Sequence, residues 1–355
     1  MEPTEEHRPV YDVIDRLAGD LPRVTGLRAL RPRLVELQQR AHGVLFDDPH
    51  PDLVAGALAV AAEHRAPAAV AHYTALLGDD SLARAITEGA DVDGRTGAAV
   101  AHARLLTRTP SAASREDIEA LYGAGFTDAA VVTFSQAVAF VNQQLQLAAG
   151  LRLLAGGEPA TGLIPTVDGG REFTLDVLTW HPFVRPIPKD ELSEEHRRAL
   201  RGKKADTPYF RTLGHDLAVL AERTAIDLAA FTSEGGLPRA ERELAATAVS
   251  MHNGCVYCAS VHARLAARNG LGEGPVRRLL AHGSRAVTGR RPNLVARFAA
   301  GLAPVPATAT GGDVTDLRAA GLTDLELVDL VHCAAFFAWA NRLMLSLGSH
   351  REPAA

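Results

Sequence analysis

Two cysteines, a histidine and a glutamate are spaced in this sequence so that they could carry out thiol redox chemistry. Cys255 and Cys258 form a Cys-x-x-Cys pair, His262 follows one helical turn later, and Glu243 precedes the first cysteine by twelve residues. A thiol pair can cycle between dithiol and disulfide, and an imidazole–carboxylate couple can accept and relay a proton. Together these groups point to the reduction of a peroxide.

Two helices with a turn between them are expected to hold these residues. Residues 237–252 predict a helix with proline in its first turn, Asn253-Gly254 predicts its end, and residues 255–268 predict a second helix. In one straight helix Glu243 would lie ~18 Å from Cys255, at about 1.5 Å per residue. We therefore expect the turn to fold the second helix back beside the first.

On the second helix the reactive groups share one face. Cys255 and Cys258 are three residues apart, and Cys258 and His262 are four apart. The first turn of a helix favours negative charge, so this position is expected to lower a thiol pKa. We expect Cys258 to attack the peroxide because it lies one turn from His262. Cys255 would be the resolving sulfur and the contact for the reductant, and Glu243 would orient the imidazole.

The elements around this motif are predicted to be helical, which makes the fold class all-α. Residues 53–62 and 67–77 place apolar side chains at intervals of three and four. The best strand candidate, residues 177–184, is short. A charged helix is expected around residues 191–202. The 355 residues, 47% of them hydrophobic, suffice for two domains with real cores.

The chain also repeats itself. Residues 117–128 align without a gap with residues 313–324, which lie 196 positions later, and the similarity continues to Phe140 and Phe336. In each copy a short helix ends at a glycine and a second helix restarts behind a Thr-Asp cap. The repeat predicts that the chain holds two copies of one helical fold.

Three segments follow from the repeat. Residues 1–155 are predicted to form one helical domain, residues 156–175 a linker, and residues 176–355 the domain with the redox motif. Each copy alone would expose an apolar helix face, so we expect the two domains to pack as a pseudo-dimer.

The first domain keeps the predicted helices but contains no cysteine. We align the first domain with the second by matching two histidines that lie 190 positions apart. In this alignment, other residues stand in the first domain at the positions of the two cysteines and the glutamate. The aligned pairs are His72 with His262, Ala68 with Cys258, Arg65 with Cys255 and Leu53 with Glu243. This predicts a degenerate copy without redox chemistry.

Composition narrows the function further. The net charge of −5 gives no basic footprint for nucleic acid. The acidic N-terminus lacks the apolar stretch of a signal peptide, and no apolar run approaches the ~18 residues of a membrane helix. With only three cysteines, a reducing, cytoplasmic location and a catalytic or metal-binding Cys-x-x-Cys pair are expected.

The motif resembles the alkylhydroperoxidase D and carboxymuconolactone decarboxylase superfamily, in which a glutamate, a Cys-x-x-Cys pair and a histidine have this spacing. The resemblance rests on residues 237–244, 253–262 and 336–343, and it is closest to the peroxidase-related branch. It covers roughly residues 175–350, so that the chain resembles a tandem fusion with a degenerate N-terminal copy.

The resemblance implies an all-helical fold and peroxidatic cysteine chemistry without a cofactor such as flavin or haem, and without a metal. It implies that Cys258 is peroxidatic, Cys255 resolving, and that Glu243 and His262 relay protons. It further implies a hydroperoxide substrate, a dithiol reductant such as a lipoyl or thioredoxin-like protein, and a homo-oligomer. Tyr257 stands where the alkylhydroperoxidase branch can have a histidine, and the decarboxylase branch lacks the cysteine pair.

Other interpretations stay open at this point. The cysteines could bind zinc together with His262 and His252, or they could be inert buried thiols. The protein could be a lyase or isomerase of the same fold that uses Glu243 and His262 as acid and base. It could also be a redox-sensing interaction module. Cys333, in an apolar helix, is expected to be a packed core thiol.

Overall fold

The computed structural model describes residues 12–19, 21–158, 171–200 and 202–350, and this part of the chain is almost entirely helical. The all-α prediction is therefore confirmed. The described strands are two residues long, β1 (His181–Pro182) and β2 (Gly348–Ser349), and they pair antiparallel. The strand candidate at 177–184 is thus reduced to β1. Most of the predicted linker falls at 159–170, outside the described residues.

The helices follow one another with short turns. The α-helices are α1 (Val13–Ala18), α2 (Pro22–Arg28), α3 (Pro32–Phe46), α4 (Pro51–Glu63), α5 (Pro67–Leu77), α6 (Asp80–Glu88), α7 (Gly94–Arg108), α8 (Arg115–Gly123), α9 (Asp128–Leu154), α10 (Glu194–Ala199), α11 (Pro208–Leu213), α12 (Leu217–Thr232), α13 (Arg239–His252), α14 (Val256–Ala266), α15 (Glu273–His282), α16 (Arg290–Leu302), α17 (Gly311–Ala319) and α18 (Asp324–Leu347). Short helical turns are η1 (Pro110–Ala112), η2 (Lys189–Glu191), η3 (Gly202–Asp206), η4 (Ala267–Leu271) and η5 (Ser284–Ala286). The charged helix expected at 191–202 is confined to α10.

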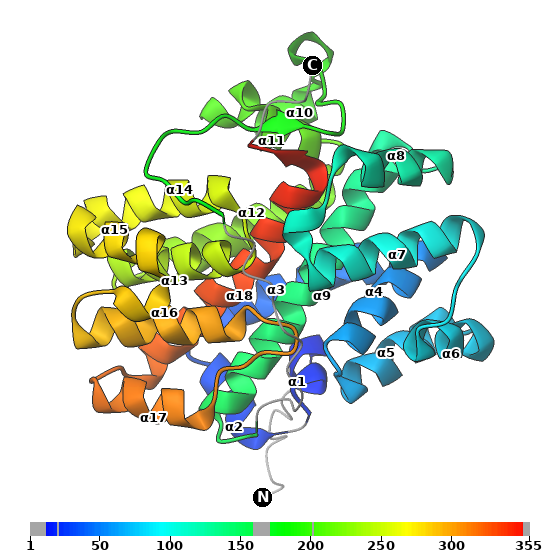
Figure 1. Ribbon diagram of the computed structural model, residues 1–355. Coiled ribbons are helices and arrows are strands. Elements are labelled where there is room, and N and C mark those ends of the chain that lie inside the picture. The colour runs from blue at the N-terminus through cyan, green and yellow to red at the C-terminus, as the bar shows by residue number, and fades with distance from the viewer. Residues whose placement is uncertain (1–11, 20, 159–170, 201, 351–355) are drawn as a thin grey trace, which may run out of the picture.

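Two long helices form the centre of the molecule. Helices α9 and α18 run side by side, with α4 to α8 on one side of them and α13 to α17 on the other (Figure 1). Helices α3 and α12, which precede the two flanking groups in the chain, also pack against each other. These two pairs of corresponding helices thus pack across the centre, as a pseudo-dimer requires.

Contacts between α9 and α18 obey the same pseudo-symmetry. Ser135 on α9 shares a hydrogen bond of 2.9 Å with Ser346 on α18. The counterpart of this contact, 196 positions away for each partner, joins Val331 to Gly150. A Cβ added to Gly150 would lie 2.6 Å from a Val331 methyl group, so the backbones approach closely there. The two contacts thus join equivalent positions of the two halves, although one is a hydrogen bond and the other is apolar.

Helix α18 is buried along nearly its whole length. It is long and apolar enough by composition to span a membrane, and 94% of that stretch is buried among the other helices. The expectation that no apolar run reaches this length was therefore wrong. A helix that is apolar on every face suits the centre of a large helical core equally well.

The repeat caps have the predicted geometry. Thr127 and Thr323 each accept a hydrogen bond from the backbone N–H three residues later, at the starts of α9 and α18. Gly125 and Gly321 have φ of 87° and 89°, which lets the chain turn after the preceding short helix. The sequence repeat is thus a repeat of local structure.

The register of the redox region differs by one residue from the prediction. The backbone bond from Cys255 N to Ser250 O matches the bond from Ala66 N to Ala61 O, which is a shift of 189 positions rather than 190. The first-half residues that correspond to the four redox residues are therefore not those that the sequence alignment predicted. The corrected pairs are Tyr73 with His262, Ala69 with Cys258, Ala66 with Cys255 and Val54 with Glu243.

The conformation of Arg65 accounts for the one-residue error in the alignment of the two halves. It has φ of 52° and is, among the described residues, the one non-glycine residue with positive φ. It occupies the turn position of Gly254, whose φ is 70°. Because sequence patterns reserve this conformation for glycine, an arginine there concealed the match.

Candidate active site

The turn between α13 and α14 places the sulfurs. Helix α13 ends at His252, and Gly254 then adopts a left-handed conformation, which lets Cys255 N bond to Ser250 O at 2.9 Å. Cys255 caps the start of α14, and Cys258 lies in its first turn. The two helices pack against each other as predicted.

This turn is tightly covered. A Cβ at Gly254 would lie 2.6 Å from the Ser111 Cβ and 2.9 Å from the Arg171 Nε. Arg171 in turn donates a hydrogen bond of 2.8 Å to the Ser111 carbonyl. Glycine is therefore required both for its positive φ and for the space that it leaves.

The two sulfur atoms lie together in the protein interior. Cys255 Sγ and Cys258 Sγ are 2.7 Å apart as free thiols, and their residues are 1% and 5% exposed. Such proximity lets a disulfide close with little movement of the backbone. A short sulfur–sulfur distance also means that oxidation of one thiol brings the other within attacking reach.

Burial changes the expected acidity of the first thiol. The pKa of Cys255 is raised well above its ordinary value, mainly because the thiol is removed from water and also because Cys258 lies beside it. The prediction that the helix start lowers the pKa of this thiol was wrong. Desolvation opposes the charged form and outweighs the partial charge of the helix end.

Glu243 and His262 form the predicted couple. His262 Nδ1 lies 2.5 Å from Glu243 Oε2, and the carboxylate is fully buried. The other carboxylate oxygen is in an ion pair with Arg239, one turn earlier on α13. This arrangement fixes the orientation of the imidazole and leaves its Nε2 as the nitrogen available to a reacting group.

Aromatic rings surround the imidazole. The ring of His262 lies 4.4 Å from that of Phe337 in an edge-to-face arrangement, and Phe231 packs at 6.1 Å. These rings limit the access of water to one side of His262. The couple therefore operates beside an apolar wall, where its interactions are stronger than in water.

A cavity of about 100 Å³ connects the site to the surface. Cys258 and His262 both line it, together with Tyr257, Tyr209 and Arg223. Cys255 does not line it and is almost completely buried, so the expectation that Cys255 contacts the reductant is not supported by its position. Cys258 is the sulfur that faces the cavity.

Asn341 is a site residue that the sequence analysis did not single out. Its side chain accepts a hydrogen bond of 3.0 Å from Asn253 and donates one of 3.0 Å to Ser250. It also interacts with the Cys255 thiol. The available signal was a polar residue at the end of the apolar stretch 334–340 of helix α18.

The structure also bears on Cys333 and on the zinc interpretation. Cys333 is buried and its thiol donates to the Ala230 carbonyl at 3.5 Å, as expected for a packed core residue. The zinc interpretation needs four ligands around one point, with His252 among them. Within the part of the chain that the structure describes, no three His, Cys, Asp or Glu side chains are grouped as metal ligands.

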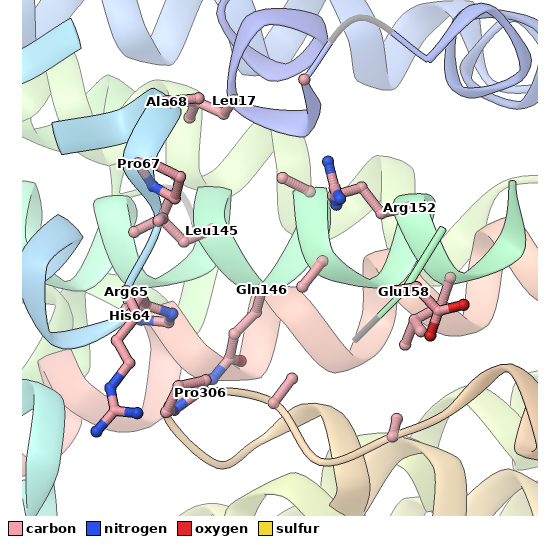
Figure 2. Close-up of a pocket in the computed structure, with 17 residues that line it drawn as sticks. Leu17, His64, Arg65, Pro67, Ala68, Leu145, Gln146, Arg152, Glu158 and Pro306 are labelled. Carbon is pink, nitrogen blue, oxygen red and sulfur yellow. The ribbon is translucent and has the colours of Figure 1, made fainter. Parts of the chain in front are cut away.

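A larger cavity, of about 460 Å³, is lined mainly by residues of the first half and also by Pro306, Ala307 and Ala309 of the second (Figure 2). His64 and Arg65 line one end beside Pro306, and Arg152 and Glu158 line the other. Burial lowers the pKa of His64 to about 3, so its imidazole is neutral at ordinary pH. None of the four predicted redox residues lines this cavity.

Comparison with known proteins agrees with the motif. Residues 218–301 match the carboxymuconolactone decarboxylase family, and this segment contains all four predicted site residues. The resemblance inferred from the motif is therefore confirmed over this region.

One solved structure is similar to part of the chain. It is the alkylhydroperoxidase AhpD core of an uncharacterized peroxidase-related protein from Ralstonia eutropha JMP134, at 25% sequence identity and a TM-score of 0.41. The match covers 46% of this chain and 88% of the other. No curated protein matches the chain.

Proposed function

We propose that the protein is a thiol-dependent hydroperoxide reductase whose reaction takes place at Cys258. The observation that most directly supports this proposal is the position of Cys258, which lines the cavity together with His262 and lies 2.7 Å from the second thiol. A buried carboxylate holds the imidazole. These are the groups that a two-cysteine peroxidase needs.

The reaction starts with the transfer of the Cys258 proton to His262. The thiolate attacks one oxygen of the hydroperoxide, so that a sulfur–oxygen bond forms while the oxygen–oxygen bond breaks. The departing alkoxide takes the proton from His262 and leaves as an alcohol. Cys258 is then a sulfenic acid, and Glu243 has stabilised the imidazolium in the meantime.

Cys255 completes the oxidative half of the cycle. Its sulfur attacks the sulfenic acid, a disulfide forms, and water leaves. An external dithiol then reduces this disulfide by two exchange steps and is itself oxidised. Because Cys258 faces the cavity, we propose that the dithiol attacks Cys258 first and that Cys255 leaves as the thiol.

Steady-state consumption of hydroperoxide by the purified chain, with dithiothreitol as the reductant, tests this proposal. Cys258→Ser should abolish turnover, and Cys255→Ser should reduce it strongly while leaving one sulfenic acid per chain. Cys333→Ser is the matched control, because it removes the third thiol outside the cavity. Turnover that persists in Cys258→Ser would exclude the proposal.

The same assay separates the alternatives. A redox-sensing module would consume about one equivalent of peroxide and then stop, even with reductant present. A lyase or isomerase that uses Glu243 and His262 would show no peroxide turnover at all.

A further inference from the structure

Two buried polar groups in the Cys258 cavity lack partners. The hydroxyl of Tyr209 and the Nε of Arg223 are buried, and neither has a hydrogen-bond partner among the residues that the structure describes. Their residues are 8% and 5% exposed, and both line the cavity beside Cys258 and His262. Buried polar groups are nearly always hydrogen-bonded in folded proteins, so this pair requires an explanation.

Arg223 is only 5% exposed, so the positive charge of its guanidinium is largely removed from water. Within the described part of the chain, this guanidinium has an Nε without a hydrogen-bond partner. It lies instead over the rings of Phe336 and Tyr209, at 5.1 and 5.9 Å from their centroids. Aromatic faces hold the charge in place but do not neutralise it. A buried charge of this kind normally meets an anion.

Asp227 is the carboxylate nearest in sequence that shares this cavity. It lies one turn after Arg223 on α12, is half-buried, and forms no ion pair with it. Burial raises the pKa of Tyr209, so its hydroxyl stays protonated and remains a donor. The cavity therefore presents the Arg223 cation and the neutral Tyr209 donor beside the reactive sulfur, and the Asp227 carboxylate also lines it.

We propose that Tyr209 and Arg223 form an anion site that receives the departing oxygen of the peroxide during attack by Cys258. The proposal rests on the proposed function and extends it to two catalytic residues outside the motif. As the oxygen–oxygen bond breaks, negative charge develops on the alkoxide, which the guanidinium and the hydroxyl stabilise until His262 returns the proton. Preorganised donors of this kind act strongest in a site sheltered from water.

The size of the cavity defines the substrate class. Its volume of about 100 Å³ is well below the roughly 300–1,000 Å³ of sites for drug-sized ligands. Phe336 and Phe337 form apolar parts of the wall. The site thus suits hydrogen peroxide and small alkyl hydroperoxides, and bulky lipid hydroperoxides should react slowly.

The first experiment measures the anion site without relying on peroxidase activity. Iodoacetate carries a carboxylate and iodoacetamide does not, and both alkylate thiols. The ratio of their rates at Cys258, followed by peptide mass spectrometry, should fall about 10-fold or more in Arg223→Gln. It should fall less in Arg223→Lys, which keeps the charge. A ratio that does not change in Arg223→Gln would overturn the proposal.

The second experiment measures the reaction itself. Oxidation of Cys258 by hydrogen peroxide in a single turnover should slow about 10- to 100-fold in Tyr209→Phe, which removes only the hydroxyl, and in Arg223→Gln. Oxidation of the thiol pair by diamide, which releases no oxygen leaving group, should keep its rate. An equal loss with both oxidants would indicate a general structural effect and contradict the proposal.

Asp227→Asn is the matched control on the same helix. Removal of this negative charge should raise the iodoacetate preference, and a fall would contradict an anion site. If the unmodified chain does not reduce peroxide while the alkylation ratio behaves as expected, the proposed function fails and the anion site stands. If peroxide reduction is intact in both Tyr209→Phe and Arg223→Gln, the anion site fails alone.

Discussion

His262 Nδ1 and Glu243 Oε2 are 2.5 Å apart although the two residues are separated by 19 positions in the chain. The contact exists because Gly254 reverses the chain and lays α14 against α13. The carboxylate is fully buried and has Arg239 as its second partner. Glu243 thus fixes the orientation of the imidazole, and His262 lines the same cavity as Cys258.

Glu243→Gln should slow peroxide reduction by about 10- to 100-fold, because the amide cannot stabilise the imidazolium that forms during proton transfer. The measurement is the rate of Cys258 oxidation by hydrogen peroxide in stopped flow. Glu241→Gln is the control on the same helix, since Glu241 pairs with Arg291 outside the site. Equal rates in the two variants would contradict a role for the couple.

Resolution of the sulfenic acid should accelerate with pH. Because burial raises the pKa of Cys255, this thiol stays protonated through the neutral range, and its thiolate fraction grows about tenfold per pH unit. Trapping with dimedone at intervals after a peroxide pulse measures the sulfenic acid that remains. In Cys255→Ser the trapped species should persist at every pH. A resolution rate that is constant from pH 6.5 to 9 would contradict this expectation.

The motif predicted this site well because its chemistry depends on local spacing. The helix break at Asn253-Gly254 and the approach of Glu243 to His262 follow from turn residues and helix geometry alone. The pKa of Cys255 cannot be predicted from local spacing, because it depends on burial by helices that are distant in sequence. Tyr209 and Arg223 could not be found either, since they belong to no motif and meet the sulfur only in the folded chain.

Gly254→Ala should destabilise the protein by about 2–5 kcal/mol. A left-handed conformation costs alanine about 1–2 kcal/mol, and contact with Ser111 and Arg171 adds overpacking strain of about 1–3 kcal/mol. Gly321→Ala is the control, because Gly321 also has positive φ but has no neighbour within 4 Å of the added Cβ. Urea unfolding should show the larger loss for Gly254→Ala, and equal losses would contradict the close packing of this turn.

The protein should lose stability as the pH falls from 6.5 towards 4. Burial lowers the pKa of His42 and His102 to about 4 and that of His64 and His332 to about 3. Below pH 6.5 the unfolded chain therefore binds more protons than the folded chain, and each such histidine lowers the free energy of unfolding by about 1.4 kcal/mol per pH unit.

Thermal unfolding at pH 7.5 and pH 5.5 measures this effect. His64→Gln should reduce the difference between the two pH values, since glutamine can donate to Asn142 as the imidazole Nε2 does but does not titrate. A melting temperature that is independent of pH over this range would show that these histidines are not buried as described.

The sequence was sufficient to predict two paired helical copies, but not the exact alignment of residues between the two copies. The repeat at residues 117–128 and 313–324 predicted the matching caps, and the expectation of paired halves agrees with the packing of α9 on α18. The match of His72 with His262 was wrong by one residue because Arg65 adopts a conformation that sequence patterns assign to glycine. The backbone hydrogen bonds identify which residue of the first half corresponds to each residue of the second half.

The shared interior of α9 and α18 also limits how this chain can evolve. Because Gly150 and Ser135 contact residues of the opposite half, deletion of the N-terminal copy would uncover the centre of α18. Loss of the N-terminal copy would therefore destabilise the domain that carries the thiols, even though this copy has no thiol of its own. A silent duplicate of this kind is a place where a new activity can arise without loss of the old one.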